Sequence, residues 1–503
     1  MRKIALILLC MIISVISANI NAYAIDNLPT TFSAVEQGWV TSVKNQGDTA
    51  SCTAHSVTST VESALLSQGY SDADSLNLSE LHFIYCAKTI FSNSLGLNIG
   101  DTGYYLSLDD LFYKGYPIEY ALTDTMRNVG LVNENEYNSL DKYKTYEEYI
   151  KTLTPEEKSD YINNSEFQVN SFFVSSDMNT NKKHIMKYGS MIAGYYHDSE
   201  YMKTSLGSTY YFYNKIVNHN HAICIVGWDD SISKYKFTTD DGHIPDGNGA
   251  WLVKNSYGTG FGDNGYMWIS YYDKSLTEFC GLTCTYKESD DYYDSCYQYD
   301  SGGNYIPVKA SKFANTFVSD SDEILKAISY MSDKSRFDFT LQIYKNNNTD
   351  NPESGELIYE QAYKHELPGY KMIKLDNAIE LKKGTVYSIV IETNDNNSYL
   401  NAEHSSYSDC IKIPEAGRGE SFIYNKEWID ISTTTDGTKN IAIKAYTDEA
   451  VYTDEVKSTS HSQACIEIIN CYSGQTLYSE FLIITIILSF AFTIVILFKM
   501  KKK

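Results

Sequence analysis

Four side chains that could catalyse acyl transfer lie at three separate places in the sequence. Cys52 begins the stretch CTAHSVTSTVESALLSQ, whose apolar residues recur at helical spacing, and the free N–H groups at a helix start favour a thiolate. His221 opens the strand-like run HAICIVGW, and Asn255 ends another, AWLVKN. An imidazole can shuttle the thiol proton, and an amide can hold the imidazole ring in place. Gln46 adds a side-chain amide that, with the Cys52 backbone N–H, could stabilise an oxyanion.

Each of these residues also has a structural interpretation. Taken alone, Cys52 is better explained as a structural thiol or a disulfide partner. Its coincidence with Gln46, His221 and Asn255 reverses that preference and makes Cys52 the expected nucleophile. His219 competes with His221 for the role of base, because residues two apart on a strand share a face.

Two other groups of candidate residues are expected to have no role in the chemistry. His55 lies three residues after Cys52 and is expected to be a packed or exposed helix residue rather than a second base. Asp240, Asp241 and Asp246 could ligate calcium, but their spacing is not that of an EF-hand loop. A solvated loop is the preferred interpretation.

Two segments of different pattern must position these residues. Residues 25–285 mix helical and strand patterns, which predicts an α+β domain. Residues 286–448 carry short strands such as FDFTLQIYKN and TVYSIVIETND between Gly, Asn and Asp turns, which predicts an all-β sandwich.

The two ends of the chain have the composition of targeting segments. Residues 1–24 have two basic residues, an apolar run and a small-residue end, as in a secretory signal peptide. Residues 479–503 contain an uncharged run, FLIITIILSFAFTIVILF, followed by lysines, which predicts a single transmembrane helix with a cytoplasmic tail. Residues 449–478 would then form a stalk. We therefore expect a single-pass protein of the cell membrane with its amino-terminal part outside the cell.

Charge and cysteine content agree with an exported protein. The formal net charge of −23 argues against a nucleic-acid partner. Of the ten cysteines, one lies in the predicted signal peptide, so an odd number remains and at least one is expected to be unpaired. Cys465 and Cys471 are a plausible local pair.

Three sequence blocks give a specific resemblance. VKNQGDTASC, NHAICIVGW and GAWLVKNSYGTGFGDNGYMWIS resemble, in order, the signature blocks of papain-like cysteine proteases, and LSELHFIYC and KGYPIEYAL resemble two weaker ones. The resemblance implies a two-lobed α+β fold, no metal and no organic cofactor. It also implies that Cys52 is the nucleophile, His221 the base, Asn255 the residue that orients it and Gln46 an oxyanion donor.

The same resemblance implies a substrate cleft. Gly115 and Tyr116 would border the groove that holds the substrate backbone. Met191 and Ala222 would lie near that groove and, with Tyr116, favour an apolar side chain. Tyr257 would cover the hydrogen bond between the triad's amide and imidazole.

The chain also departs from the family pattern. Thr49 replaces a cysteine that normally pairs with the one at Cys86, Thr53 replaces a tryptophan, His55 replaces a phenylalanine and Tyr257 replaces another tryptophan. None of these changes removes a catalytic group. His221 and Asn255 lie farther from Cys52 than the family spacing, so insertions are required, for which residues 87–113 and 238–249 are the obvious places.

The β-rich part has its own resemblance. Segments such as KFANTFVSDSDEILKAISYM and GYKMIKLDNAIELKKGTVYSIVIETND resemble the lectin-like domain that follows papain-like domains in bacterial surface proteases. This implies a sandwich, but a fold does not establish sugar binding, and a spacer or a peptide-binding module fits as well.

Together these observations predict a membrane-anchored extracellular cysteine endopeptidase that acts on protein or peptide substrates through a thioester. No inhibitory pro-domain is expected, because only residues 25–27 separate the predicted signal peptide from a stretch like a mature amino terminus. The alternative is a surface adhesin that binds glycan or matrix through its β-sandwich, with the papain-like part as scaffold.

Overall fold

The computed structural model describes residues 28–88, 115, 117–127, 131–134, 154, 166–345, 348, 350–393, 399–405, 413 and 415–450. Several sequence predictions fall outside these ranges. They concern the signal peptide, Tyr116, nearly all of the first insertion, most of the stalk, and the apolar run at 481–498. In the described part of the chain, no helix is both long and apolar enough to cross a membrane.

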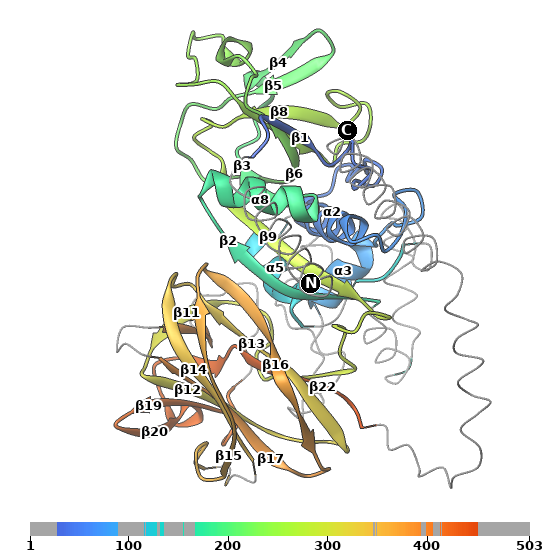
Figure 1. The fold of residues 1–503 in the computed structure, drawn as a ribbon. Coiled ribbons are helices and arrows are strands. Elements are labelled where there is room, and N and C mark those ends of the chain that lie inside the picture. The colour runs from blue at the N-terminus through green and yellow to red at the C-terminus, as the bar shows by residue number, and fades with distance from the viewer. Residues whose placement is uncertain are drawn as a thin grey trace, which may run out of the picture. The chain divides into compact units, whose positions relative to one another are not determined.

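The amino-terminal part, through residue 286, combines helices with strands (Figure 1). Its helices are α2 (Cys52–Ser67), α3 (Glu80–Lys88), α5 (Ile118–Thr125) and α8 (Met178–Tyr188), with short 3₁₀ turns η2 (Ser199–Tyr201) and η3 (Lys234–Phe237). Its strands are β1 (Thr31–Ser33), β2 (Phe167–Val174), β3 (Met191–Tyr195), β4 (Met202–Ser205), β5 (Ser208–Tyr211), β6 (His221–Asp229), β7 (Ala250–Lys254), β8 (Tyr266–Ser270) and β9 (Thr277–Tyr286).

Helix α2 forms as its apolar spacing predicts. Ala54, Val57, Val61 and Leu65 are all fully buried, and they belong to a cluster that also takes side chains from α3, α5, β2 and β9. The helix packs against β6 and β9 (Figure 1). Since Cys52 is the first residue of α2, this packing fixes the position of its thiol relative to β6 and β9.

Strand β6 is an interior strand of the sheet that α2 contacts. It pairs with β3 on one side and with β7 on the other, both antiparallel, and all but one of its residues are buried. This explains the continuous apolar run of its sequence. Gly227 is required in β6, because a Cβ atom there would lie 2.3 Å from the Phe32 carbonyl oxygen of β1.

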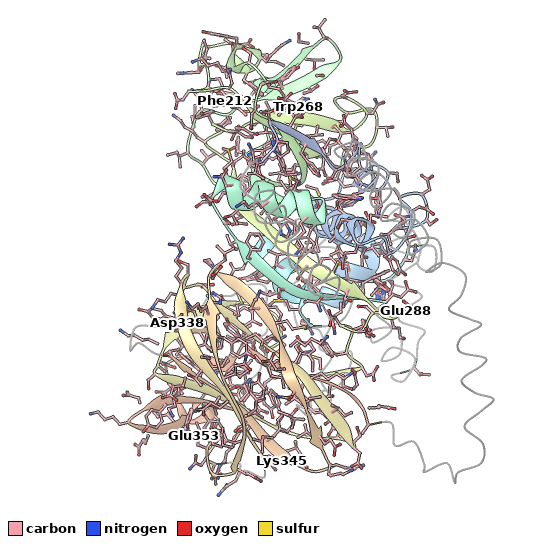
Figure 2. The ribbon with its side chains drawn as sticks, viewed as in Figure 1. Phe212, Trp268, Glu288, Asp338, Lys345 and Glu353 are labelled. Carbon is pink, nitrogen blue, oxygen red and sulfur yellow. The ribbon has the colours of Figure 1, made fainter. Side chains whose placement is uncertain are left out.

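A second hydrophobic cluster fills the space beside β3, β6, β7 and β8, and includes Tyr195, Ile225, Trp228 and Val253. The two clusters on different sides of β6 correspond to the two lobes expected from the sequence. A smaller cluster holds Phe212 near Trp268 at the β5 and β8 end (Figure 2).

The carboxy-terminal part is almost entirely β-structure, as its short strands between Gly, Asn and Asp turns predict. Its strands are β10 (Ser295–Tyr297), β11 (Tyr305–Lys309), β12 (Lys312–Val318), β13 (Glu323–Ser332), β14 (Phe337–Lys345), β15 (Glu356–His365), β16 (Gly369–Leu381), β17 (Val386–Thr393), β18 (Tyr399–His404), β19 (Ser421–Asn425), β20 (Glu427–Asp430), β21 (Thr438–Ile441) and β22 (Ile443–Glu449), with the 3₁₀ turn η4 (Ile431–Thr433).

These strands form a sandwich. The order β15-β14-β17-β12-β19-β20 makes one sheet, and β13 pairs with β16 and β22 in another. Phe339, Ile389, Ile328 and Ile443, from both sheets, are fully buried in one common cluster. The apolar residues of the alternating strands therefore face inward, as expected for two packed sheets.

Candidate active site

Cys52 lies at the first turn of α2, where backbone N–H groups have no partner within the helix. Its side chain is partly exposed, unlike those of Cys224, Cys280 and Cys284, which are buried. Burial raises the pKa of the Cys52 thiol, and a hydrogen bond with the backbone of Ala222 opposes this rise. Of these four cysteines, Cys52 is the one that a reagent or substrate can reach.

His221 and Asn255 form a hydrogen-bonded pair across two neighbouring strands. His221 is the first residue of β6, Asn255 directly follows β7, and His221 Nε2 lies 2.8 Å from Asn255 Oδ1. The backbone N–H of Ser256 donates to the same Oδ1 at 2.8 Å, which establishes that this atom is the amide oxygen. His221 Nε2 must then carry the hydrogen, so its Nδ1 is the atom left to accept a proton.

Aromatic rings surround His221. Tyr257 stacks on it with the ring centroids 4.8 Å apart and the planes inclined by 24°, and the Tyr257 hydroxyl lies 3.4 Å from His221 Nδ1. The ring of His197 also lies nearby, with its centroid 5.8 Å from that of His221, and its Nδ1 shares a hydrogen bond with the Tyr195 hydroxyl at 2.7 Å. Burial lowers the pKa of His221 to about 4, while the hydrogen bond to Asn255 works in the opposite direction.

One pocket joins the thiol and the imidazole. Cys52 and His221 both line a cavity of about 290 Å³, together with Gly115, Pro117 and Ala222. Gly115 has a φ of +73°, and a Cβ atom there would lie 3.0 Å from the Ala50 carbonyl oxygen. Glycine therefore allows the chain to approach the residues just before Cys52 closely.

Gln46 is held beside the pair but does not line this pocket. Its Nε2 donates to the Thr49 carbonyl oxygen at 2.6 Å, and its Oε1 accepts from the Ser256 hydroxyl at 2.6 Å. An amide nitrogen carries two hydrogens, so one remains for another acceptor. The structure thus fixes the orientation of the Gln46 amide and leaves it one donor.

Two of the predicted substrate-binding residues need comment. Met191 is fully buried in the second hydrophobic cluster and does not line the pocket of Cys52, so its expected place near the groove is wrong. Successive residues of a strand face opposite sides, and the side chain of Met191 on β3 faces the hydrophobic core. Tyr116 lies outside the described residues.

The alternative base and the alternative calcium ligands have other contacts. His219 lines the pocket, but its Nε2 lies 3.8 Å from a carboxylate oxygen of Glu278. Asp240 forms an ion pair with Lys203, and Asp241 accepts a hydrogen bond from Thr239 at 2.5 Å. Among the described ranges, no group of His, Cys, Asp and Glu side chains has the arrangement of a metal site.

Sequence reasoning missed a buried charged cluster beneath α2. Lys44 Nζ lies 2.7 Å from Glu80 and 3.4 Å from Glu62, and the Lys254 ammonium reaches Glu62 through the hydroxyl of Thr41. Burial favours neutral Glu80, but Lys44 outweighs it and holds the pKa of that carboxyl well below its ordinary range. No local pattern reveals such a cluster, because its members come from four separate segments.

The sequence also gave no sign of the part played by Tyr195, His197 and Ser256. The one usable signal is the alternation of β3, whose last residue Tyr195 is paired in register with His221. These three residues extend the hydrogen-bonded and aromatic surroundings of the imidazole.

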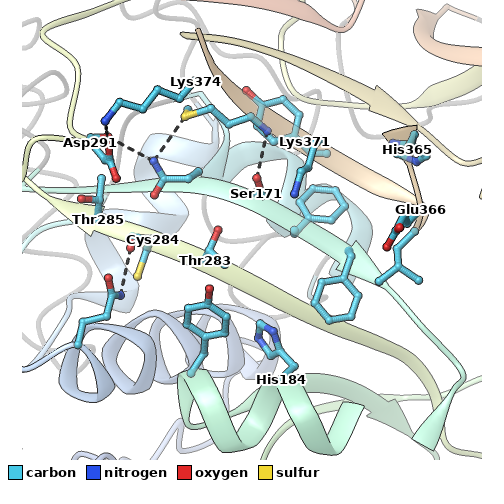
Figure 3. Close-up of a pocket in the computed structure, with 18 of the residues that line it drawn as sticks. Ser171, His184, Thr283, Cys284, Thr285, Asp291, His365, Glu366, Lys371 and Lys374 are labelled. Atoms are coloured by element: carbon cyan, nitrogen blue, oxygen red, sulfur yellow. Dashed lines mark hydrogen bonds and ion pairs between the residues drawn. The ribbon is translucent and has the colours of Figure 1, made fainter. Parts of the chain in front are cut away.

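A larger cavity lies elsewhere (Figure 3). Its volume is about 650 Å³, and its lining includes His184 of α8, Thr283 of β9 and Lys374 of β16, which pairs with Asp291 at 2.6 Å. Neither Cys52 nor His221 reaches it. The candidate active site is therefore identified by its chemistry and not by cavity size.

Comparison with known proteins identifies the families of both parts of the chain. Residues 28–288, just over half of the chain, match the family model of the papain family cysteine proteases, and residues 296–447 match that of a lectin-like domain. The chain belongs to the papain family of cysteine proteases. The predicted enzyme class, a papain-like cysteine-type peptidase, and the presence of a lectin-like domain are confirmed.

Individual relatives give the same picture. Cysteine proteinase 2 of Entamoeba histolytica is 25% identical over 239 residues, which are 46% of this chain and 60% of that protein. Cathepsin M of Mus musculus is 27% identical over 258 residues, which are 51% of this chain and 64% of that protein. The match thus spans less than two thirds of the length of these relatives.

Solved structures of one relative cover both domains. The clostridial cysteine protease Cwp84 after propeptide cleavage is 26% identical with a TM-score of 0.66, and the match covers 84% of this chain and 99% of that one. A second structure, of the cysteine protease and lectin-like domains of Cwp84, has the same identity and TM-score and covers 90% of that chain. The papain-like fold followed by a β-rich domain is confirmed.

The predicted single-pass localisation in the cell membrane is contradicted, and we correct it. No described helix could serve as a membrane span. The solved relative is described as a surface layer associated protein of Clostridium difficile. The apolar run on which the prediction rested lies outside the described residues.

Proposed function

We propose that this chain is an extracellular cysteine endopeptidase in which Cys52, His221 and Asn255 form the catalytic triad. The observation that carries the proposal is the pocket that Cys52 shares with His221, whose other ring nitrogen is bonded to Asn255 at 2.8 Å. This geometry supports the assignment of nucleophile, base and orienting group to the three residues.

In the proposed reaction, the Cys52 thiol gives its proton to His221 Nδ1, and the sulfur attacks the peptide carbonyl. His221 then returns that proton to the leaving amine as the C–N bond breaks, which leaves a thioester on Cys52. In the second half, His221 takes a proton from water, the hydroxide attacks the thioester, and Cys52 leaves with the proton. Asn255 holds the ring so that Nδ1 faces the thiol throughout.

The oxyanion of each tetrahedral intermediate is proposed to bind between the Cys52 backbone N–H and the Gln46 amide. The supporting observation is that, among the residues that the structure describes, Gln46 uses one of its two amide hydrogens, on the Thr49 carbonyl. The Ser256 hydroxyl holds the amide oxygen and so prevents the group from turning over. Preorganised donors of this kind stabilise charge where it develops.

We propose that protein or peptide chains are the substrates and that the lectin-like domain holds the enzyme at a cell surface by binding a glycan or a protein. The support is the two-domain match to a surface-layer-associated protease. The rival function is an adhesin in which the papain-like domain is inert. A partly exposed cysteine in one pocket with a hydrogen-bonded histidine speaks against an inert domain.

An epoxide reagent that alkylates papain-type thiols tests the proposed function. We expect the secreted chain to be labelled at Cys52, as mapped by peptide mass spectrometry, and to lose peptide hydrolysis in proportion. Cys52→Ala should abolish both, and His221→Ala should abolish labelling while Cys52 is still present. Cys280→Ser is the matched control, because this buried thiol lines neither the pocket of Cys52 nor the small cavity beside Asn255. Equal labelling of wild type and His221→Ala, or no labelling of either, would favour the adhesin.

A further inference from the structure

A second, much smaller cavity adjoins Asn255. Its volume is about 10 Å³, which is about the room that one water molecule needs. His55, Ser56, Asn255 and Ser256 are among the residues that line it, whereas Cys52 and His221 are not. This cavity is therefore distinct from the pocket in which substrate would bind.

Asn255, which lines this cavity, has a donor without a partner in the described part of the chain. Its Oδ1 accepts from the Ser256 backbone N–H and from His221, so the other atom, Nδ2, carries the two hydrogens. Nδ2 is buried and has no hydrogen-bond partner among the residues that the structure describes. A buried amide donor is costly to leave unbonded, and the residue is only 2% exposed.

His55 presents the complementary acceptor. Its Nδ1 lies 2.9 Å from the Ser51 carbonyl oxygen, which can only accept, so Nδ1 carries the hydrogen. Burial lowers the pKa of His55, with Glu80 opposing and Lys44 and Lys254 adding to the effect, so the ring is neutral. His55 Nε2 is then a lone-pair acceptor, and it too is buried without a partner in the described part of the chain.

We propose that one water molecule in this cavity accepts a hydrogen bond from Asn255 Nδ2 and donates one to His55 Nε2, which makes His55 a positioning residue for the His221–Asn255 pair. The inference rests on the proposed triad. The Ser56 hydroxyl donates to the Cys52 carbonyl at 2.9 Å, so its oxygen can accept the second hydrogen of the water. The water thus has three partners, the usual number for a buried one.

The link couples the two halves of the site. His55 is tied to Ser51, the residue before the nucleophile, while Asn255 holds the base. Through the water, the plane of the Asn255 amide is fixed relative to the start of α2. The link depends on an acceptor at position 55, which an aromatic hydrocarbon side chain there would not offer.

Kinetics of two substitutions test the proposal. His55→Phe removes the acceptor, and we expect kcat for a peptide substrate to fall about tenfold, the lower end of what outer positioning partners contribute, with KM nearly unchanged. His55→Gln keeps a side-chain acceptor and should recover most of that loss. His184→Phe is the matched control, because His184 is also buried with an unbonded Nε2 but does not line either cavity at the triad.

A second readout separates positioning from a loss of stability. The rate of Cys52 alkylation, measured against pH, should change its profile in His55→Phe and keep it in His184→Phe. The inference is overturned if His55→Phe matches His184→Phe in kcat and in this profile. It is also overturned if His55→Gln fails to recover activity although it folds, as shown by circular dichroism.

Crystallography of the wild-type enzyme gives a test that does not depend on any variant folding. Electron density for a water between Asn255 Nδ2 and His55 Nε2 would support the inference, and a dry cavity at a resolution that shows other buried waters would overturn it. Failure of the proposed function would give a different result. Wild-type Cys52 would then not be alkylated, and the wild-type protein would not hydrolyse peptides, whatever occupies the cavity.

Discussion

The Nε2 atom of His221 lies 2.8 Å from Oδ1 of Asn255, although 34 positions separate the two residues. Antiparallel pairing of β6 with β7 brings them together, since one residue begins the first strand and the other follows the end of the second. The register of two strands therefore decides which nitrogen of the imidazole remains free to accept a proton.

Removing the amide should slow catalysis without unfolding the protein. Asn255→Ala deletes one hydrogen bond to a ring that becomes charged during the reaction, and such a bond is worth about 1.5–3 kcal/mol, or about 10- to 100-fold in kcat. Steady-state hydrolysis of a peptide substrate measures this. Asn248→Ala is the control, because that side chain lies in an exposed loop and accepts only from the Lys234 backbone. Activity of Asn255→Ala equal to this control would remove the amide from the mechanism.

The acid limb of activity should lie well below neutral pH. His221 must be unprotonated to accept the thiol proton, and burial lowers its pKa to about 4. Since the charged form is disfavoured, kcat/KM should persist as pH falls through the ordinary histidine range near 6.5 and decline only around pH 4. A profile of kcat/KM against pH measures this. A half-maximal point near pH 6.5 would contradict it.

The Tyr257 ring should protect the triad more through its area than through its hydroxyl. Tyr257→Phe keeps a ring stacked 4.8 Å from that of His221, so hydrolysis should stay close to wild type. Tyr257→Ala opens the hydrogen bond of His221 to water, and activity should fall on the order of tenfold, as for a weakened bond of about 1.4 kcal/mol. Equal losses in the two variants would instead assign the effect to the hydroxyl.

Buried histidines should make the fold sensitive to acid. Burial lowers the pKa of His82 and of His184 to about 3. Between the unfolded value near 6.5 and about 3, the unfolded chain binds more protons than the folded one, so stability is full above pH 6.5 and falls as pH decreases. Urea unfolding of wild type and His184→Phe at several pH values measures this, and the variant should show the smaller slope. Identical slopes would contradict the assignment.

The buried charged cluster should be sensitive to loss of its cation. Lys44→Met leaves the buried carboxylates of Glu62 and Glu80 short of a partner, which should cost about 3–5 kcal/mol of unfolding free energy. Lys374→Met is the matched control, because its ion pair with Asp291 is exposed and should be worth at most about 1 kcal/mol. Comparable losses in the two variants, by denaturant unfolding, would count against the cluster.

Local patterns were sufficient for much of the fold. The stripe Ala54, Val57, Val61 and Leu65 predicted α2, because burial of one helix face imposes a period on the sequence. The runs around His221 and Asn255 predicted β6 and β7, because strands buried on both faces are apolar nearly throughout. The prediction for Met191 failed for a related reason. A residue known to be on a strand near the groove can face either side, and only the packing of β3 shows that it faces the core.

The sequence by itself determined the chemistry available to this protein: a thiol at a helix start, an imidazole and an amide at strand ends, and two domains of different pattern. Those features depend on residue types and on neighbours within a few positions. Only the tertiary structure decided that Cys52 and His221 share one pocket, that Nε2 of His221 is the nitrogen bonded to Asn255, and that His55 and Asn255 line one cavity. Such relations join segments far apart in the chain, and they are set by strand register and side-chain packing, which no local pattern encodes.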